Sequence, residues 1–133
     1  MTNSFRIFTI SMIFLVIGGC VSSEGLLRGR VYQYYANWDP RIMWQLSSEH
    51  FRKMVAETEQ EYVESLEKNN YLKEFEEVTS SIVDMSITGN KARVKMRFQG
   101  KVIATGKRFD DILYDYWVFE HGNWYMNQPS RAE

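Results

Sequence analysis

Residues 83–98 read VDMSITGNKARVKMRF, and this stretch decides the fold class. From Ala92 to Phe98, apolar side chains alternate with basic ones over seven residues. Such alternation is typical of a strand with one buried and one exposed face. Residues 83–87 alternate in the same way, with Val83 among the expected inward residues, and Gly89-Asn90 suits a two-residue turn. The sequence therefore predicts an antiparallel hairpin.

Two further apolar runs follow this hairpin. Residues 112–119 are apolar on both faces apart from Asp115, and His121-Gly122 predicts a turn into a last strand over residues 123–127. Gly100 interrupts the second run and indicates a bulge there. We expect a curved antiparallel sheet of about four strands.

The preceding half of the chain has helical periodicity. Apolar residues recur at intervals of three and four over residues 30–38, and Asp39-Pro40 suits the start of a short helix over residues 40–46. A third helix is predicted from Ser48 to about Lys68, with a break near Thr58. Helices followed by an antiparallel meander define an α+β domain.

Composition excludes several classes of protein. The chain has 133 residues, one cysteine, 44% hydrophobic residues and a formal net charge of −1. One cysteine rules out an internal disulfide and a Cys-rich zinc site, and the two histidines, His50 and His121, lack metal-site spacing. The balanced charge argues against a nucleic-acid partner. We expect no metal and no cofactor. No G-x-S-x-G motif occurs, and nothing in the sequence points to a catalytic triad.

The N-terminus is typical of a targeting segment. Arg6 precedes an 11-residue apolar core, residues 7–17, which is too short to span a bilayer as a helix. Gly18, Gly19 and Cys20 follow this core. The sequence predicts a signal peptide over residues 1–19. An uncleaved signal anchor and a cleaved signal with an incidental cysteine remain alternatives.

The run Ile17-Gly18-Gly19-Cys20 resembles the lipobox of bacterial lipoproteins. The resemblance implies cleavage before Cys20 and acylation of that cysteine with palmitate-type chains, which hold a protein at a membrane stably. Val21 follows the cysteine where an aspartate would signal inner-membrane retention, which favours the periplasmic face of the outer membrane. Residues 20–29 are predicted to be a linker reaching roughly 30 Å when extended.

A second resemblance concerns the mature domain. An aromatic first helix ending in Trp38, a short helix begun by Asp39-Pro40, and the closing run YWVFEHGNWY over residues 116–125 are similar to the NTF2-like superfamily. That resemblance implies a cone-shaped α+β domain over residues 30–128, with a frayed tail at 129–133. It carries over no catalytic residue, because the catalytic patterns of NTF2-like isomerases and dehydratases do not match here.

Asp115 is the polar residue that the strand pattern can place inside the cone. Burial would raise the pKa of its carboxyl group and make it a usable general base. Tyr35, Trp38 and Trp117 would join it in a pocket. Three alternatives remain: Asp115 faces solvent, it pairs with a basic residue across the sheet, or the aromatic residues fill the core.

Charge is segregated along the mature chain. Residues 49–77 contain nine acids and four bases, a net charge of −5, whereas residues 91–108 contain seven bases and no acid. The basic side chains of the second strand predict a patch for an anionic partner. They are Lys91, Arg93, Lys95, Arg97 and Lys101. A plain solvated sheet face is the alternative.

These features favour a non-enzymatic, membrane-anchored binding or accessory module of the cell envelope. Its partner would be an envelope protein or an anionic polymer, and dimerisation through the sheet is left open. The alternative is a small-molecule-binding protein or a lyase/isomerase-type enzyme that uses an open cone around Asp115.

Overall fold

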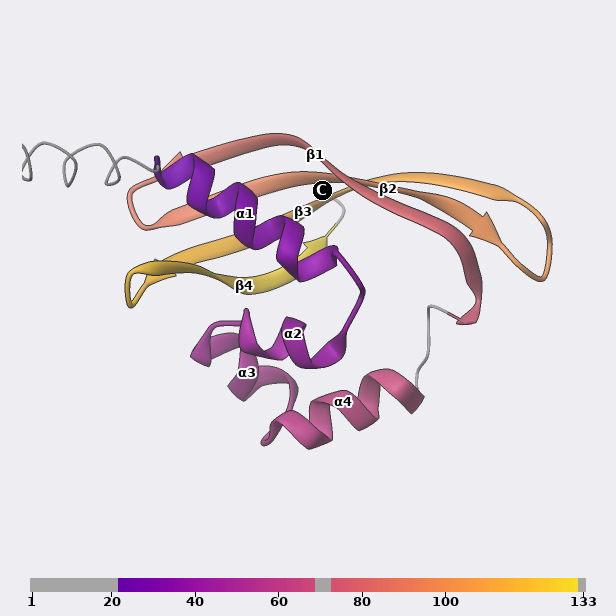
Figure 1. Ribbon diagram of the computed structural model, residues 1–133, viewed down its shortest axis with the longest axis horizontal. Coiled ribbons are helices and arrows are strands. Elements are labelled where there is room, and N and C mark those ends of the chain that lie inside the picture. Colours follow the sequence, from indigo (N-terminus) through magenta and orange to yellow (C-terminus); the bar gives the residue numbers. More distant parts are fainter. Residues whose placement is uncertain (1–21, 69–72, 132–133) are drawn as a thin grey trace, which may run out of the picture.

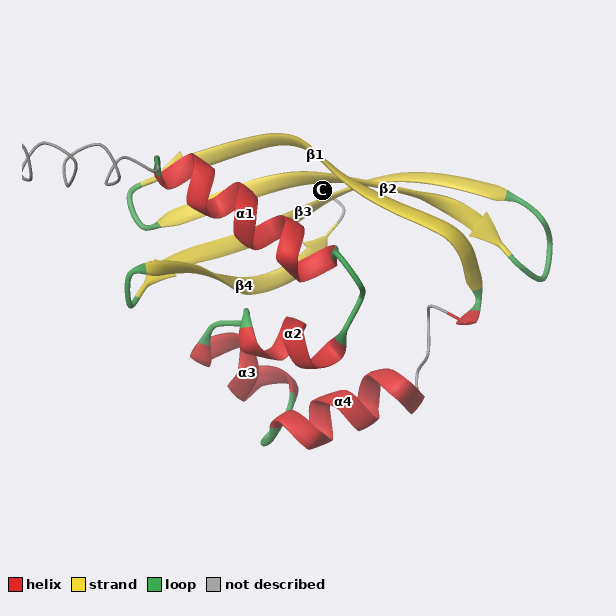
Figure 2. Cartoon of the chain, in the orientation of Figure 1, coloured by secondary structure: helices red, strands yellow, loops and turns green. Residues whose placement is uncertain are grey.

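The protein folds as helices followed by strands, as the sequence predicts. The computed structural model describes residues 22–68 and 73–131. All the helices lie on one side of a long curved sheet (Figures 1 and 2). The elements are α1 (Ser23–Tyr35), α2 (Pro40–Gln45), α3 (Glu49–Val55), α4 (Glu59–Lys68), β1 (Phe75–Thr88), β2 (Lys91–Val102), β3 (Arg108–Glu120) and β4 (Asn123–Arg131). The predicted α+β class is confirmed.

The sheet is an antiparallel meander in the order β1-β2-β3-β4. The predicted hairpin turns are both present, with Gly89 and Gly122 at positive φ, 61° and 77°. The strands are longer than predicted: β1 begins at Phe75, and β3 begins at Arg108. Residues 129–131, expected to be frayed, belong to β4, whose backbone pairs with β3 up to Arg131.

The irregularities of the sheet lie in its two outer strands. β1 carries an extra residue between Glu76 and Thr79 and another between Ile82 and Asp84, each opposite an unbroken stretch of β2. The bulge predicted at Gly100 is therefore wrong in position, because the extra residue lies opposite it on β1. β4 likewise has two register shifts against β3. Val83, expected inside, lies at the second bulge and is 49% exposed.

Helix α1 begins earlier than the sequence indicates. Ser22 caps it by accepting from the Gly25 amide at 3.0 Å, and Leu27 in its second turn is completely buried. The prediction that residues 23–29 are a linker is wrong: they form the first half of this helix. Within the described residues, regular structure therefore begins with α1 at Ser23 rather than at residue 30.

The shorter helices close the edge of β4. Met126 accepts a hydrogen bond from the Ser48 amide and donates one to the Leu46 carbonyl, both at 2.7 Å, where Ser47 forms a parallel bridge. The Ser48 hydroxyl accepts from the Phe51 amide and thereby caps α3. The break between α3 and α4 falls at residues 56–58, close to the predicted position.

The core lies between the sheet and the helices. Its members include the inward row of β2, the buried face of α1 and large residues of the last two strands. They are Leu27, Val31, Tyr34, Tyr35, Ala92, Val94, Met96, Phe98, Trp117, Trp124 and Met126. Within the two described ranges, no helix is both long and apolar enough to cross a membrane.

Candidate functional site

Asp115 lies on the helix-facing side of the sheet. It pairs with Val94 of β2, in the row of inward-facing residues, and its exposed fraction is 0%. Alternation along β3 gives Trp117 the same orientation, opposite Ala92. The solvent-facing alternative for Asp115 is therefore wrong. A carboxyl group at such a position needs hydrogen-bonding partners to offset the loss of water.

Helix α1 supplies one such partner. The Tyr35 hydroxyl donates to Asp115 Oδ2 at 2.5 Å, across 80 positions of sequence. A hydrogen bond this short, made by a hydroxyl to a carboxyl oxygen inside the core, is among the stronger kinds. The Tyr35 ring also contacts Trp38 and Phe98 edge-on, with centroids 5.3 Å apart in both pairs. Tyr35 is thereby fixed at both its ring and its hydroxyl.

The preceding residue, Tyr34, is held in a different way. Burial raises the pKa of the Tyr34 phenol well above its ordinary value of 10.0, and the nearby Tyr62 and Asp115 raise it further. Tyr34 and Tyr62 share a side-chain hydrogen bond. The Tyr34 ring lies edge-on to Trp117, with centroids 5.7 Å apart. Two consecutive tyrosines therefore attach α1 to α4 and to β3.

A groove opens beside this cluster, between the C-terminal half of α1 and the first part of β1. Its volume is about 440 Å³. Aromatic and aliphatic side chains line it, with two hydroxyl groups from the strand. The lining residues are Val31, Tyr32, Tyr35, Ala36, Trp38, Val78, Thr79, Ser80 and Met96. Trp38 reaches its place through a backbone turn at positive φ, 50°.

The predicted pocket residues divide into two groups. Tyr35 and Trp38 line the groove, whereas Asp115 and Trp117 lie behind it in the core. The structure brings Asp115 and Tyr35 together but leaves the carboxyl group without access to the groove. The Trp117 indole nitrogen has no hydrogen-bond partner among the described residues. Trp117 therefore serves packing.

Sequence reasoning missed the strand side of the groove. Val78, Thr79 and Ser80 belong to the part of β1 that precedes Val83, where the predicted strand began. Glu76, Glu77 and the first bulge obscure the alternation there. Tyr32 was also missed: it is 54% exposed, on the face of α1 away from the buried Val31, Tyr34 and Tyr35, and the apolar periodicity of the helix gives no signal for it.

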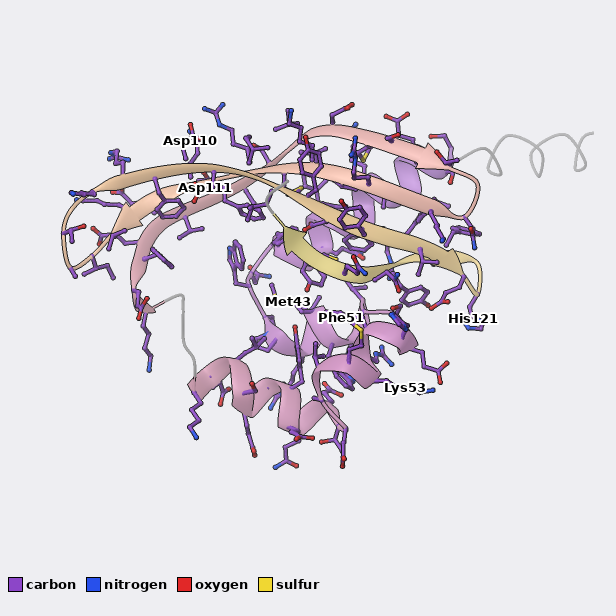
Figure 3. The ribbon with its side chains drawn as sticks, turned by 180° about the vertical axis from the view of Figure 1, so that it is seen from behind. Met43, Phe51, Lys53, Asp110, Asp111 and His121 are labelled. Atoms are coloured by element: carbon purple, nitrogen blue, oxygen red, sulfur yellow. The ribbon has the colours of Figure 1, made fainter. Side chains whose placement is uncertain are left out.

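The predicted basic patch lies on the other face of the sheet, away from the helices. Figure 3 shows Asp110 on that outer face and Met43 and Phe51 on the helix side. Arg97 and Lys101 make ion pairs there: Arg97 donates to both carboxylate oxygens of Asp110 at 2.8 and 2.5 Å, and Lys101 lies 3.5 Å from Glu76.

The remaining bases lie toward the Gly89-Asn90 end of β2. Arg93 lies over the Tyr114 ring, 4.8 Å from its centroid, and Lys95 lies 6.0 Å from the same centroid. Lys91 is exposed beside the turn. The basic face is consequently less charged than the sequence of β2 alone indicates.

Metal-binding groups do not gather in the described part of the chain. Nowhere in residues 22–68 and 73–131 do three His, Cys, Asp or Glu side chains approach closely enough to hold an ion. His50 lies on α3, His121 lies in the β3–β4 turn, and both are exposed. The predicted signal peptide and the lipidation of Cys20 fall outside the described residues.

No family model matches the chain, and no curated protein matches it. Solved structures do share its fold. They include an NTF2-like protein from Burkholderia thailandensis (19% identity, TM-score 0.51, covering 78% of this chain and 89% of that one). A hypothetical protein with a ketosteroid isomerase-like fold from Catenulispora acidiphila has 11% identity and a TM-score of 0.53 over 72% and 79% of the two chains.

TsrD from Streptomyces laurentii is similar at 21% identity, with a TM-score of 0.57 over 77% of this chain and 83% of that one. Identities this low show the fold alone. The chain therefore has an NTF2-like α+β fold, which confirms the predicted architecture.

Proposed function

We propose that the protein is a non-enzymatic binding module, tethered to the cell envelope by lipid on Cys20, that takes its ligand in the groove between α1 and β1. The groove itself is the observation that carries this proposal. It holds about 440 Å³ and is lined by Tyr32, Tyr35 and Trp38 on the helix side. Small-molecule sites in proteins commonly measure about 300–1,000 Å³ and are mostly apolar.

The lining indicates the kind of ligand. Its described members carry no formal charge, and the hydroxyl groups of Thr79 and Ser80 are its hydrogen-bonding side chains on β1. Aromatic rings favour a flat or compact apolar partner. We therefore expect a small, mainly apolar ligand with one or two hydrogen-bonding groups.

A pair of substitutions at the C-terminal end of α1 tests the groove. Ala36, the C-cap of α1, lines the groove, whereas Gln33 is exposed on the helix and outside the lining. Ala36→Phe should fill the groove and remove any small molecule that copurifies with the protein, as seen by native mass spectrometry. Gln33→Phe should retain that molecule. A ligand kept by the Ala36→Phe variant lies elsewhere, and the groove proposal would then be wrong.

The anchor is supported by the run Ile17-Gly18-Gly19-Cys20. Cys20→Ala should abolish incorporation of labelled palmitate, and Val21→Ala should not. A processed size that is unchanged by an inhibitor of the lipoprotein signal peptidase would contradict the anchor. The residue after the cysteine supports placement at the periplasmic face of the outer membrane.

The alternative function is a lyase or isomerase that uses Asp115 as a base. The observation in its favour is that Tyr35, which lines the groove, donates a hydrogen bond to the buried Asp115 behind it. The observation against it is that the carboxyl group is fully buried and engaged by the Tyr35 hydroxyl. A base must come within hydrogen-bonding reach of the substrate proton.

Asp115→Asn distinguishes the two functions, because asparagine also accepts a hydrogen bond from Tyr35. Turnover of a ligand that is identified in the groove should be absent from both proteins if the module only binds. Retained binding in the variant, with turnover present in the parent and lost in the variant, would establish the enzyme instead.

A further inference from the structure

The start of α1 is fixed to one end of the sheet. The Trp124 indole nitrogen donates to the Ser23 carbonyl at 3.1 Å, and Arg30 Nε donates to the Trp124 carbonyl at 2.8 Å. The Arg30 guanidinium also lies over the Tyr125 ring, 4.9 Å from its centroid. The first two turns of α1 are therefore held against the beginning of β4.

Two turns of the sheet share this end of the molecule. Figure 1 shows the start of α1, the β1–β2 turn and the β3–β4 turn at one end, and the β2–β3 hairpin at the opposite end. A hydrogen bond of 2.7 Å from the Phe119 amide to the Asn90 carbonyl joins the β1–β2 turn to the end of β3, just before the β3–β4 turn. We call residues 88–91 and 121–123, with the first turn of α1, the turn end.

The connection between Cys20 and the helix is very short. Ser22 is already the N-cap, so the chain from Cys20 to Ser23 spans three peptide steps, which reach about 10 Å when fully extended. The roughly 30 Å tether expected from the sequence is thereby reduced about threefold. A lipid on Cys20 would leave the domain little freedom to tumble above the bilayer.

We propose, on the basis of the lipid anchor proposed above, that the turn end rests on the lipid headgroups and that the groove faces away from the membrane. The surface chemistry of the turn end fits a headgroup contact without insertion. Its exposed side chains are polar or charged, among them Asn90, Lys91 and His121. The exposed large apolar side chains of the described residues all lie outside it.

The groove lies on the far half of α1. Its lining residues on α1 lie between Val31 and Tyr35, and α1 is 13 residues long, which corresponds to about 20 Å. An upright domain would therefore present the groove to a ligand or partner in the aqueous compartment. Ligands dissolved in the bilayer would not reach it directly.

Site-specific labelling of the lipidated full-length protein tests this orientation. The chain contains one cysteine, and lipidation consumes its thiol, so one introduced cysteine gives a single reactive site. Glu24→Cys and Asn90→Cys place a fluorophore at the turn end, and Ala104→Cys places it in the β2–β3 hairpin; all three positions are exposed. The 12 residues of β2 separate the two ends by roughly 40 Å.

The readout is quenching by nitroxide-labelled headgroups in vesicles of phosphatidylethanolamine and phosphatidylglycerol. Labels at positions 24 and 90 should be quenched at least threefold more than the label at position 104. Insertion of ten Gly/Ser residues between Val21 and Ser22 should abolish the difference, because the domain can then tumble.

Each outcome has a distinct meaning. Equal quenching at all three positions of a vesicle-bound protein, or stronger quenching at position 104, overturns the orientation and leaves the anchor standing. A protein that carries no lipid and does not float with the vesicles overturns the anchor, and the orientation with it.

Discussion

At the scale of single residues, the buried phenol of Tyr34 makes the free energy of unfolding depend on pH in the alkaline range. Burial raises the pKa of Tyr34 above its unfolded value of 10.0, so above pH 10 the folded state binds more protons than the unfolded state. The free energy of unfolding must then fall as the pH rises further, by up to about 1.4 kcal/mol per pH unit for one such group.

Urea denaturation at several pH values between 9 and 11 measures this fall. We expect Tyr34→Phe to lower stability at neutral pH, through loss of the hydrogen bond with Tyr62, and to flatten the alkaline decline. Tyr32→Phe is the matched control, because Tyr32 is exposed on the same helix. Identical alkaline slopes in the parent and the Tyr34 variant would contradict the assignment.

Gly100 gives a second prediction at this scale. A Cβ atom at this position would lie 2.6 Å from the Phe109 ring and 3.3 Å from the Glu76 carbonyl. Gly100→Ala should therefore lower the free energy of unfolding by about 1–3 kcal/mol, as overpacked sites do.

Gly29 is the control for Gly100, because a Cβ atom there would meet nothing within 4 Å. It lies inside α1, so Gly29→Ala should raise stability by about 0.5–1 kcal/mol through helix propensity. Both values are measured by chemical denaturation. A neutral Gly100→Ala variant would mean that Phe109 moves aside freely.

From the sequence, the inward orientation of Asp115 was only one of several alternatives. The local pattern of β3 allows either face, because residues 112–119 are apolar on both. What decides the orientation is Tyr35, which lies 80 positions earlier in the chain. A pairing of that kind depends on how α1 packs on the sheet, and no local pattern encodes it.

At the scale of elements, α3 stabilises the end of α2 through Arg52. Its guanidinium donates to the carbonyls of Trp44 and Gln45 at 2.9 and 3.0 Å and lies over the Trp44 ring. The last carbonyls of a helix lack partners within that helix, and one planar fork here satisfies two of them.

Arg52→Lys should lower the free energy of unfolding by about 1–2 kcal/mol, because an ammonium group cannot reproduce both hydrogen bonds and the ring contact. Lys53→Gln is the control, since Lys53 makes an exposed ion pair with Glu49 and should change stability by less than about 0.5 kcal/mol. Thermal unfolding measures the stability of both variants. Equal effects of the two substitutions would show that the two hydrogen bonds of the Arg52 guanidinium are dispensable.

The mistaken linker shows why element boundaries were harder to predict than element types. Gly25 and Gly29, together with the serines at 22 and 23, read as a flexible stretch. Leu27 and Val31 are nevertheless completely buried, and this packing offsets the poor helix propensity of the two glycines. Ser22 contributes the N-cap.

At the scale of the whole molecule, the outer face of the sheet is only partly free to bind an anion. Arg97 and Lys101 are engaged by Asp110 and Glu76, whereas Lys91 and Lys95 make no ion pair within the described part of the chain. We therefore expect the Lys91 and Lys95 half of the patch to dominate binding of a polyanion.

Salt-dependent retention on dextran sulfate resin measures that binding. The double variant Lys91→Gln, Lys95→Gln should elute at clearly lower salt than the parent. Arg97→Gln with Lys101→Gln should shift elution less, although it removes the same charge. Salt-independent retention, or equal shifts in the two variants, would contradict an anion-binding face.

The segregation of charge could be predicted from the sequence, and the alternation of β2 correctly placed its bases on one face. The partners that neutralise Arg97 and Lys101 could not be predicted, since the pairing register of β3 and β1 is what brings Asp110 and Glu76 beside them. The groove was likewise hidden, because it exists only where α1 meets a bulged strand.

The bulges of β1 affect whether the sheets of two copies of this protein can pair edge to edge. β4 is covered by residues 46–48, but no described strand covers the outer side of β1, and an uncovered edge can recruit a strand from another molecule. Two extra residues break the straight run of backbone groups along β1. A bulged edge pairs poorly with a second strand, so copies of this protein can meet at β1 without their sheets joining into fibrils.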